Sequence, residues 1–471
     1  MGIRYDVYTP YSEVHGHAST FDPATGALLI AGQNGVSNTA GLQTDHRGVE
    51  PRVGAAFDMG HELVIRGAYG ITFFPMNTTS TADLKNPPFV STLSTCGVAS
   101  NSAVKCPAGM TRFADGLPAP TPVTLSTPGV SIPVAMDPNY KTSYMHQYNL
   151  TVQKQLKANV VTVSYVGLLG RDLIQLVALN AAPPNTGTLQ TLRPYYSVAP
   201  LLGDVTMSQS HGTSNYNALQ SIFERRFNRG LAFNVNYTYA QNLGNSTPGS
   251  EQGQGGYGIV PKDVNRHDYG NSSIAVRHVI AGTINYALPF GEHAKGLQAA
   301  FIKGWQTNVL GIWSTSVPFT VLNPANVSNT TPGTNDRLDV IGDPHVPNPS
   351  RFAFFNPGAF ASQAKGTLGN ESFMRYFGPH YRHLDVGLSK SFPLVERVNL
   401  DFSAQVFNMF NTPNFANPVA NLPAVTAADT PTVTLANIND TTKNPNHFGQ
   451  ITSMITSYTP RVFQFSLKLH F

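Results

Sequence analysis

The chain has 471 residues, more than one ordinary soluble core holds, so we expect either several domains or one large closed sheet. Charged residues make up only 12% of the chain, against about 25% in typical soluble domains. The net charge of +4 comes from scattered basic residues, which argues against nucleic-acid binding, and 10% aromatic residues argue against a disordered or collagen-like chain.

Uncharged polar residues, rather than charges, account for the mean hydropathy of −0.14. This composition is typical of a sheet that alternates lipid-facing apolar residues with small polar ones. No apolar run of about 18 residues occurs, which excludes a conventional transmembrane helix but not a membrane-spanning barrel.

Apolar and polar residues alternate in about twelve segments, which predicts about twelve β-strands. Short turns join the strands in pairs, and long loops join one pair to the next. In chain order, the predicted strands are residues 3–7, 52–58, 62–74, 144–156, 160–168, 216–226, 231–239, 276–288, 303–315, 382–392, 398–408 and 461–471. The long loops are residues 10–50, 75–143, 169–215, 240–275, 316–381 and 411–458. In an outer-membrane barrel, short periplasmic turns and long extracellular loops must alternate in this way, because each strand crosses the membrane once.

The insertion at residues 75–143 is rich in proline, which lacks the N–H donor that a central strand needs. It carries Cys96 and Cys106, the only two cysteines of the chain. Two thiols alone make a poor metal site. We therefore expect a disulfide that closes a loop in an oxidising compartment.

Residues 231–239 show the most regular internal alternation, with small polar residues at every second position. This pattern predicts a strand with one lipid-facing side and one polar side. The residues expected to face lipid in this strand are Leu231, Phe233, Val235 and Tyr237.

Two later loops contain residues that partly match known ligand-binding patterns. Residues 253–258 match G-x-G-x-x-G, but no strand precedes and no helix follows, so a mobile loop is favoured over dinucleotide binding. Asp336, Asp339 and Asp343 have the ligand chemistry for Ca²⁺. Their spacing fits no standard calcium loop, which favours solvated turn residues.

Catalytic patterns are absent from the sequence. It contains no H-E-x-x-H, G-x-S-x-G or C-x-x-C, so we assign no catalytic residue and no cofactor. His15 with His17, or His380 with His383, have the chemistry to bind a metal, but without acidic or thiolate partners they are better interpreted as loop or interface histidines. A soluble secreted enzyme therefore has little support.

The chain ends in a strict alternation at residues 461–471, long enough for a tilted membrane-crossing strand. The alternative is an edge strand of a soluble β-sandwich. The segment is similar to the terminal strand of bacterial outer-membrane barrels, and this resemblance implies that Phe471 is the signal recognised by the barrel-assembly machinery. The residues expected to face lipid here are Phe463, Phe465, Leu467 and Leu469.

Aromatic residues near the predicted strand ends suit the two interfacial girdles of a barrel, with ordinary packing as the alternative for each residue. They are Tyr239, Tyr286, Trp305, Trp313 and Phe471.

Several segments, spread over nearly the whole chain, resemble TonB-dependent receptors of the Oar-like type. They are residues 51–58 with 66–70, 148–153 with 164–167, 216–220 with 224–227, 234–239, 337–344 and 407–411. The resemblance implies an all-β, antiparallel transmembrane barrel of about 22 strands, plugged by an N-terminal domain. Such receptors sit in the bacterial outer membrane and draw energy for uptake from TonB, which contacts a short N-terminal box.

This sequence shows about half of those strands, without a plug, a TonB box or the N-terminal domain of the family. Residues 1–471 therefore resemble the C-terminal portion of the barrel. The lack of a visible signal peptide suggests that Met1 is not the start of the complete polypeptide. The leading hypothesis is part of an energy-coupled transporter or receptor for an unknown solute, and the alternative is a self-contained small barrel that acts as a passive pore or surface-binding protein.

Overall fold

The computed structural model describes residues 1–74, 84–90, 95–96, 110–112, 116, 122–245, 269–291, 293–331, 336–395, 398–423 and 433–471. Within these ranges the chain is nearly all β, with a single α-helix. Cys106 and the G-x-G-x-x-G segment lie outside the described residues.

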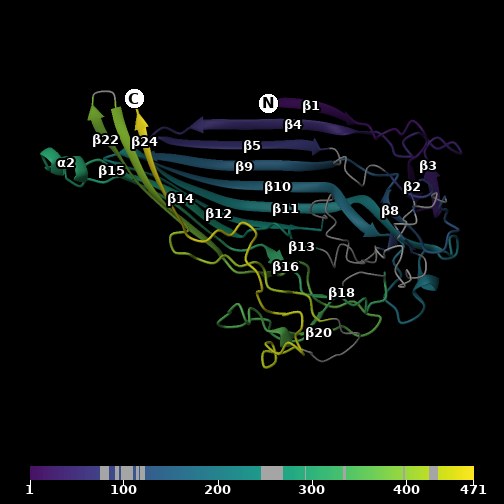
Figure 1. Cartoon of the computed structure of the whole chain (residues 1–471). Helices are drawn as coiled ribbons and strands as arrows, with labels where there is room; N and C mark the ends of the chain where they lie inside the picture. Colours follow the sequence, from purple (N-terminus) through teal and green to yellow (C-terminus); the bar gives the residue numbers. More distant parts are fainter. Residues whose placement is uncertain are drawn as a thin grey trace.

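One sheet of 14 strands dominates the described part of the chain. Twelve of its strands follow one another in sequence order and pair antiparallel, which confirms the predicted strand number and class. Figure 1 shows the sheet curling from β1 at one edge to β24 at the other. These strands are β1 (Gly2–Tyr8), β4 (Asp45–Asp58), β5 (Leu63–Phe74), β9 (Ser143–Leu156), β10 (Asn159–Ala178), β11 (Leu202–Asn228), β12 (Leu231–Gly244), β14 (His278–Ala287), β15 (Trp305–Ser314), β22 (Tyr381–Val395), β23 (Val398–Phe407) and β24 (Val462–His470).

The remaining strands belong to the long loops. Two of them extend the main sheet: β8 (Val130–Met136) pairs in parallel with β11, and β13 (Gly270–Asn271) pairs with β12. The others form two-stranded ladders: β2 (Ser19–Asp22), β3 (Ala27–Ile30), β6 (Thr95–Cys96), β7 (Thr111–Arg112), β16 (Pro318–Phe319), β17 (Leu322–Asn323), β18 (Asp336–Arg337), β19 (Asp339–Val340), β20 (Phe360–Ala361) and β21 (Tyr376–Phe377). Short 3-10 helices cover Leu189–Leu192 and Pro357–Ala359.

Short turns and long loops alternate along the sheet, as predicted. The turns between β4 and β5, β9 and β10, and β11 and β12 are residues 59–62, 157–158 and 229–230. The turn between β14 and β15 contains the α-helix α2 (Gly296–Ile302). In Figure 1, α2 and the C terminus lie at one end of the strands, and β2, β3, β8, β18 and β20 lie at the other. We call these the short-turn end and the loop end.

The apolar cores lie among the long loops and the parts of β8 and β11 at the loop end of the main sheet. One cluster joins the loop between β15 and β22 to the loop between β23 and β24, and another joins β2, β8 and the start of β11. The first consists of Phe319, Val321, Leu338, Phe355, Ala359, Phe360, Leu422, Val433 and Phe448. The second consists of Phe21, Val130, Ile132, Ala135, Ala199, Leu202, Val205 and Met207.

The prediction of a loop at residues 169–215 is wrong over much of its length. The β10–β11 ladder continues to the pair Ala178 and Thr206, well beyond the predicted strand ends. Neighbouring residues of a strand point to opposite faces, and yet Met207 (0% exposed) and Ser208 (1%) are both buried. Because both faces are covered here, the sequence lacks the apolar–polar alternation that reveals a half-buried strand.

Candidate functional site

The strand register brings the predicted lipid-facing residues of β12 and β24 onto one face of the sheet. Residues directly opposite each other in antiparallel strands share a face. From Phe233 the pairing passes through Ile284, Val309, Val386 and Val406 to Phe463. We call the side that carries these residues the apolar face.

The apolar face is open to its surroundings. On β24, Phe465 is 70% exposed and Leu467 is 65% exposed, while Leu231 and Phe233 in the middle of the sheet are half-buried by their neighbours. Soluble proteins rarely expose so large a contiguous apolar surface, which implies an apolar partner.

Among the described strand residues, charged side chains lie only near the two borders of this face. Nη2 of Arg47 lies 2.8 Å from Oδ2 of Asp45, so the Asp45 carboxylate is in a salt bridge. Aromatic residues lie at similar levels, with Trp305 and Tyr286 near the short turns and Trp313 nearer the loops. A charge-free band between two such rims is typical of a surface that spans a lipid layer. The charges on the strand residues of this face are Asp45, Arg47, Lys154, Arg171, Arg225, Arg382 and Lys390.

The opposite side, which we call the polar face, carries amide and hydroxyl side chains. The hydroxyls of Thr151 and Ser164 lie 2.9 Å apart on β9 and β10. Two carboxylates of this face bond histidines, and one of these pairs joins His383 Nε2 to Asp385 Oδ1 at 2.8 Å. The face can therefore hydrogen-bond water and polar solutes. Further members are Gln220, Asn234, Thr283, Asn308, Gln405 and Gln464.

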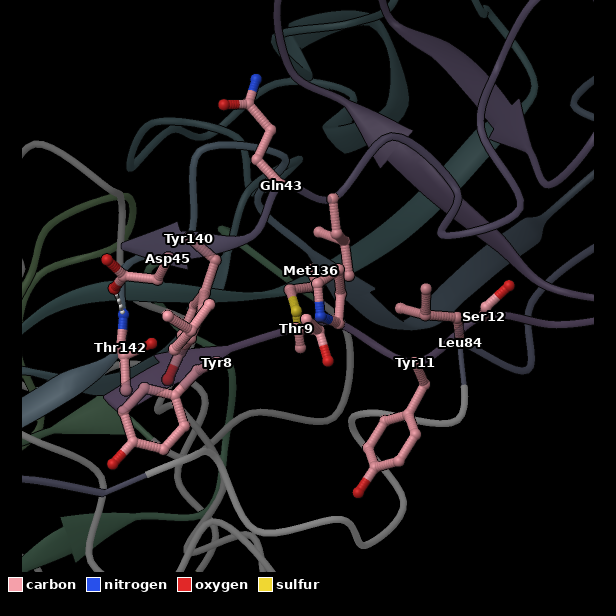
Figure 2. A pocket seen from close by; sticks show the side chains of 13 residues that line it. Tyr8, Thr9, Tyr11, Ser12, Gln43, Asp45, Leu84, Met136, Tyr140 and Thr142 are labelled. Atoms are coloured by element: carbon pink, nitrogen blue, oxygen red, sulfur yellow. Dashed lines mark hydrogen bonds between the residues drawn. The ribbon is translucent and has the colours of Figure 1, made fainter. Parts of the chain in front are cut away.

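A cavity of about 460 Å³ opens at the loop end of the edge strand β1. Figure 2 shows Tyr8, Tyr11 and Tyr140 among its lining side chains, together with Leu84 and Met136, which are buried. The N–H of Thr142 donates to Asp45 Oδ2 at 2.7 Å, and Arg47 binds the same carboxylate. Sequence reasoning missed this cavity because its lining comes from four segments, most of them in predicted loops.

Two carboxylates in the loops, those of Asp336 and Glu371, are buried, so the prediction that Asp336 is a solvated turn residue is wrong. Burial raises the pKa of Asp336, whose oxygens accept hydrogen bonds from the N–H and hydroxyl of Ser328, both at 2.7 Å. Burial likewise raises the pKa of Glu371, which accepts from the Tyr376 hydroxyl at 2.9 Å. Both carboxylates are thus held by protein donors.

The three loop aspartates do not converge on one point. Asp336 binds Ser328, Asp339 accepts the N–H of Asn370 at 2.9 Å, and Asp343 accepts the N–H of His345 at 2.9 Å. Within the described ranges, no group of three or more His, Cys, Asp or Glu side chains is arranged to hold a metal.

Two sequence predictions remain, the disulfide and the C-terminal assembly signal. Cys96, in β6, is disulfide-bonded, but Cys106 lies outside the described residues, so the pairing of the two stays a prediction. Phe471 follows β24 at the short-turn end and is exposed. Its role in assembly stays a prediction as well.

These features define a membrane protein that spans the bilayer with β-strands. Residues 1–464 match the family described as "Outer membrane beta barrel domain", and the chain belongs to this family. The protein therefore resides in the bacterial outer membrane. No helix in the described ranges is long and apolar enough to cross a membrane.

Several solved structures are similar to this chain at low identity. The outer membrane transporter YddB from Escherichia coli shows 10% identity and a TM-score of 0.41, over 90% of this chain and 40% of that one. The ferripyoverdine receptor of Pseudomonas aeruginosa shows 8% identity and a TM-score of 0.42, over 91% and 34%. The FrpB iron transporter from Neisseria meningitidis shows 9% identity and a TM-score of 0.36, over 80% and 36%. The chain thus spans 40% or less of each of these proteins. No curated protein matches it.

Proposed function

We propose that this chain is the C-terminal barrel portion of a TonB-dependent outer-membrane receptor that takes up an unidentified solute. The observation that carries the proposal is the pair of sheet edges: among the described strands, β1 pairs only with β4, and β24 only with β23. A strand edge in lipid leaves N–H and C=O groups without partners, at a cost of several kcal/mol for each group. Further strands of a larger barrel, added beside β1 and β24, would satisfy both edges.

In this proposal the apolar face contacts lipid and the polar face lines the interior. The long loops are extracellular and make the first contacts with the solute. Energy reaches the barrel through TonB and an N-terminal part of the protein that precedes this chain. The proposal includes no catalytic step and no cofactor.

A second candidate is a self-contained barrel that acts as a passive pore or surface-binding protein. The direction of the edge strands favours it. β1 runs from the short-turn end to the loop end and β24 runs back, because the strands between them alternate in direction. An even number of antiparallel strands is able to close upon itself.

Disulfide trapping distinguishes the two candidates. We would introduce Tyr5→Cys in β1 together with Phe465→Cys, Leu467→Cys or Leu469→Cys in β24, and oxidise outer membranes that contain the native full-length protein. If further strands lie between β1 and β24, none of the three pairs cross-links. A cross-link in any pair would favour the self-contained barrel. Leu400→Cys with Leu469→Cys is the positive control, because these residues are directly opposite in β23 and β24.

A further inference from the structure

The helix α2 exposes apolar side chains at the short-turn end. None of its seven residues is buried, and Leu297 (82% exposed) and Phe301 (67%) lie four residues apart on one side. An isolated helix this short is not stable in water, since helices below about 12 residues are marginal even with favourable sequences. Its exposed apolar side is therefore a surface on which a partner can pack.

The helix continues the apolar face of the sheet. The indole N–H of Trp305, at the start of β15, donates to the carbonyl oxygen of Phe301 at 2.9 Å. The Phe301 ring lies 6.4 Å from the ring of Phe392, which is paired with Leu400 on the apolar face. Figure 1 shows α2 beside β15 and β22, beyond the last residues of the sheet. The exposed side of α2 thus borders the lipid-facing band.

Lysines surround this border. Lys295 precedes α2 and Lys303 follows it, and both are exposed. Lys390 is buried, with its Nζ 4.8 Å from the centre of the Phe392 ring and donating to the carbonyl oxygen of Lys303. The sequence of residues 288–304 holds one acidic residue, Glu292, which lies outside the described residues. The turn and its neighbour Lys390 thus carry a net positive charge.

We propose that α2 lies flat in the periplasmic leaflet of the outer membrane, and that Lys295 and Lys303 bind the phosphate groups of anionic phospholipid there. An amphipathic helix with basic flanks binds an interface by burying its apolar side while its cations attract anionic headgroups. Continuity with the lipid-facing band and the positive charge both favour this partner over a protein. The proposal requires the outer-membrane location but not the uptake of a solute.

Spin-label depth measurements test the position of the helix. A nitroxide on Leu297→Cys would be measured in the native full-length protein reconstituted in vesicles of phosphatidylcholine with phosphatidylglycerol, using Phe465→Cys as the lipid control and Ser126→Cys, in a long loop, as the water control. The label on Leu297→Cys should collide more with oxygen than with a water-soluble nickel chelate, at a depth between the two controls. Accessibility equal to that of Ser126→Cys would overturn the proposal. Phe301→Cys provides a second reporter on the same side if the first variant does not insert.

Native mass spectrometry tests the lipid chemistry. The double variant Lys295→Gln, Lys303→Gln should retain phosphatidylglycerol up to about 25-fold less than the parent protein, since each cation near an anionic headgroup contributes up to about fivefold. The exposed Lys157→Gln, in the helix-free turn between β9 and β10, should leave retention unchanged. Equal retention by the double variant and the parent would overturn the headgroup assignment.

Discussion

Val235 and Asn236 are neighbours in β12 that point to opposite sides of the sheet. Val235 pairs with Phe223 and Gly282 on the apolar face, whereas Asn236 is paired on the polar face. This register makes the two positions a matched test of the assignment that places Leu231, Phe233, Val235 and Tyr237 against lipid.

Replacing Val235 by Arg should obstruct membrane assembly, because an Arg in the lipid-facing middle of a strand costs roughly 2 to 4 kcal/mol. Asn236→Arg should assemble better, since its charge remains on the polar side. The fraction of folded, heat-modifiable protein in the outer membrane measures the difference. Equal assembly of the two variants would contradict the lipid-facing assignment.

Glu371 links the stability of the loops to pH. This side chain is 2% exposed, and burial raises its pKa although Arg375 and Arg337 favour the charged form. A carboxyl whose pKa is higher in the folded state stabilises that state fully below its unfolded pKa, and this contribution is lost as the pH rises through the folded value. The loops between β15 and β22 should therefore become less protected as the pH rises.

Glu371→Gln should raise the stability of these loops at pH 7 and weaken its dependence on pH, because the amide is never ionised and still accepts from Tyr376. Hydrogen exchange of residues 336–377, followed by mass spectrometry, measures the effect. Tyr376→Phe is the matched control. It removes the donor and should lower protection by about 1 to 3 kcal/mol. Unchanged pH dependence in Glu371→Gln would refute the expected role of Glu371.

At the scale of single elements, β24 ends the sheet and carries the predicted assembly signal. Phe471→Ala should reduce assembly in cells, because recognition by the assembly machinery would lose its aromatic ring, while refolding of the purified chain in detergent should be little changed. Comparing the two yields separates recognition from stability. A similar loss in detergent would indicate that Phe471 acts through packing alone.

Strands of the main sheet were predictable because each has one apolar and one polar side. β12 begins at Leu231 and β24 covers Val462–His470, both within one residue of the predicted start. The extensions of β10 and β11 were not predictable, because Met207 and Ser208 are both buried there and alternation disappears. Alternating apolar and polar residues indicate a strand with one buried and one exposed face. A strand that is covered on both faces lacks this alternation.

The loop cores and the cavity beside β1 were also beyond sequence reasoning. Phe319, Leu338 and Phe448 form one cluster although they come from two different loops. Likewise Tyr8 and Tyr140 meet at the cavity across more than a hundred residues. Such contacts depend on how the sheet brings the loops together, which no local pattern reveals.

For the whole molecule, the proposed function predicts a native polypeptide larger than this chain. An immunoblot of outer membranes from the source organism should show a band at about twice 50.7 kDa, because a plug and further strands would be attached. A band at 50.7 kDa itself would favour the self-contained barrel.

The sequential pairing of the sheet also has a kinetic consequence. On the main path, each of the ten inner strands pairs with the strand before it and the strand after it, while β1 and β24 each pair with a single neighbour. A pairing across a short turn closes a small loop, whereas β5 with β9, or β15 with β22, pairs only after a long loop has closed, which costs more entropy. The order of synthesis and the order of strands along the main path coincide, and β24 is the last strand of both.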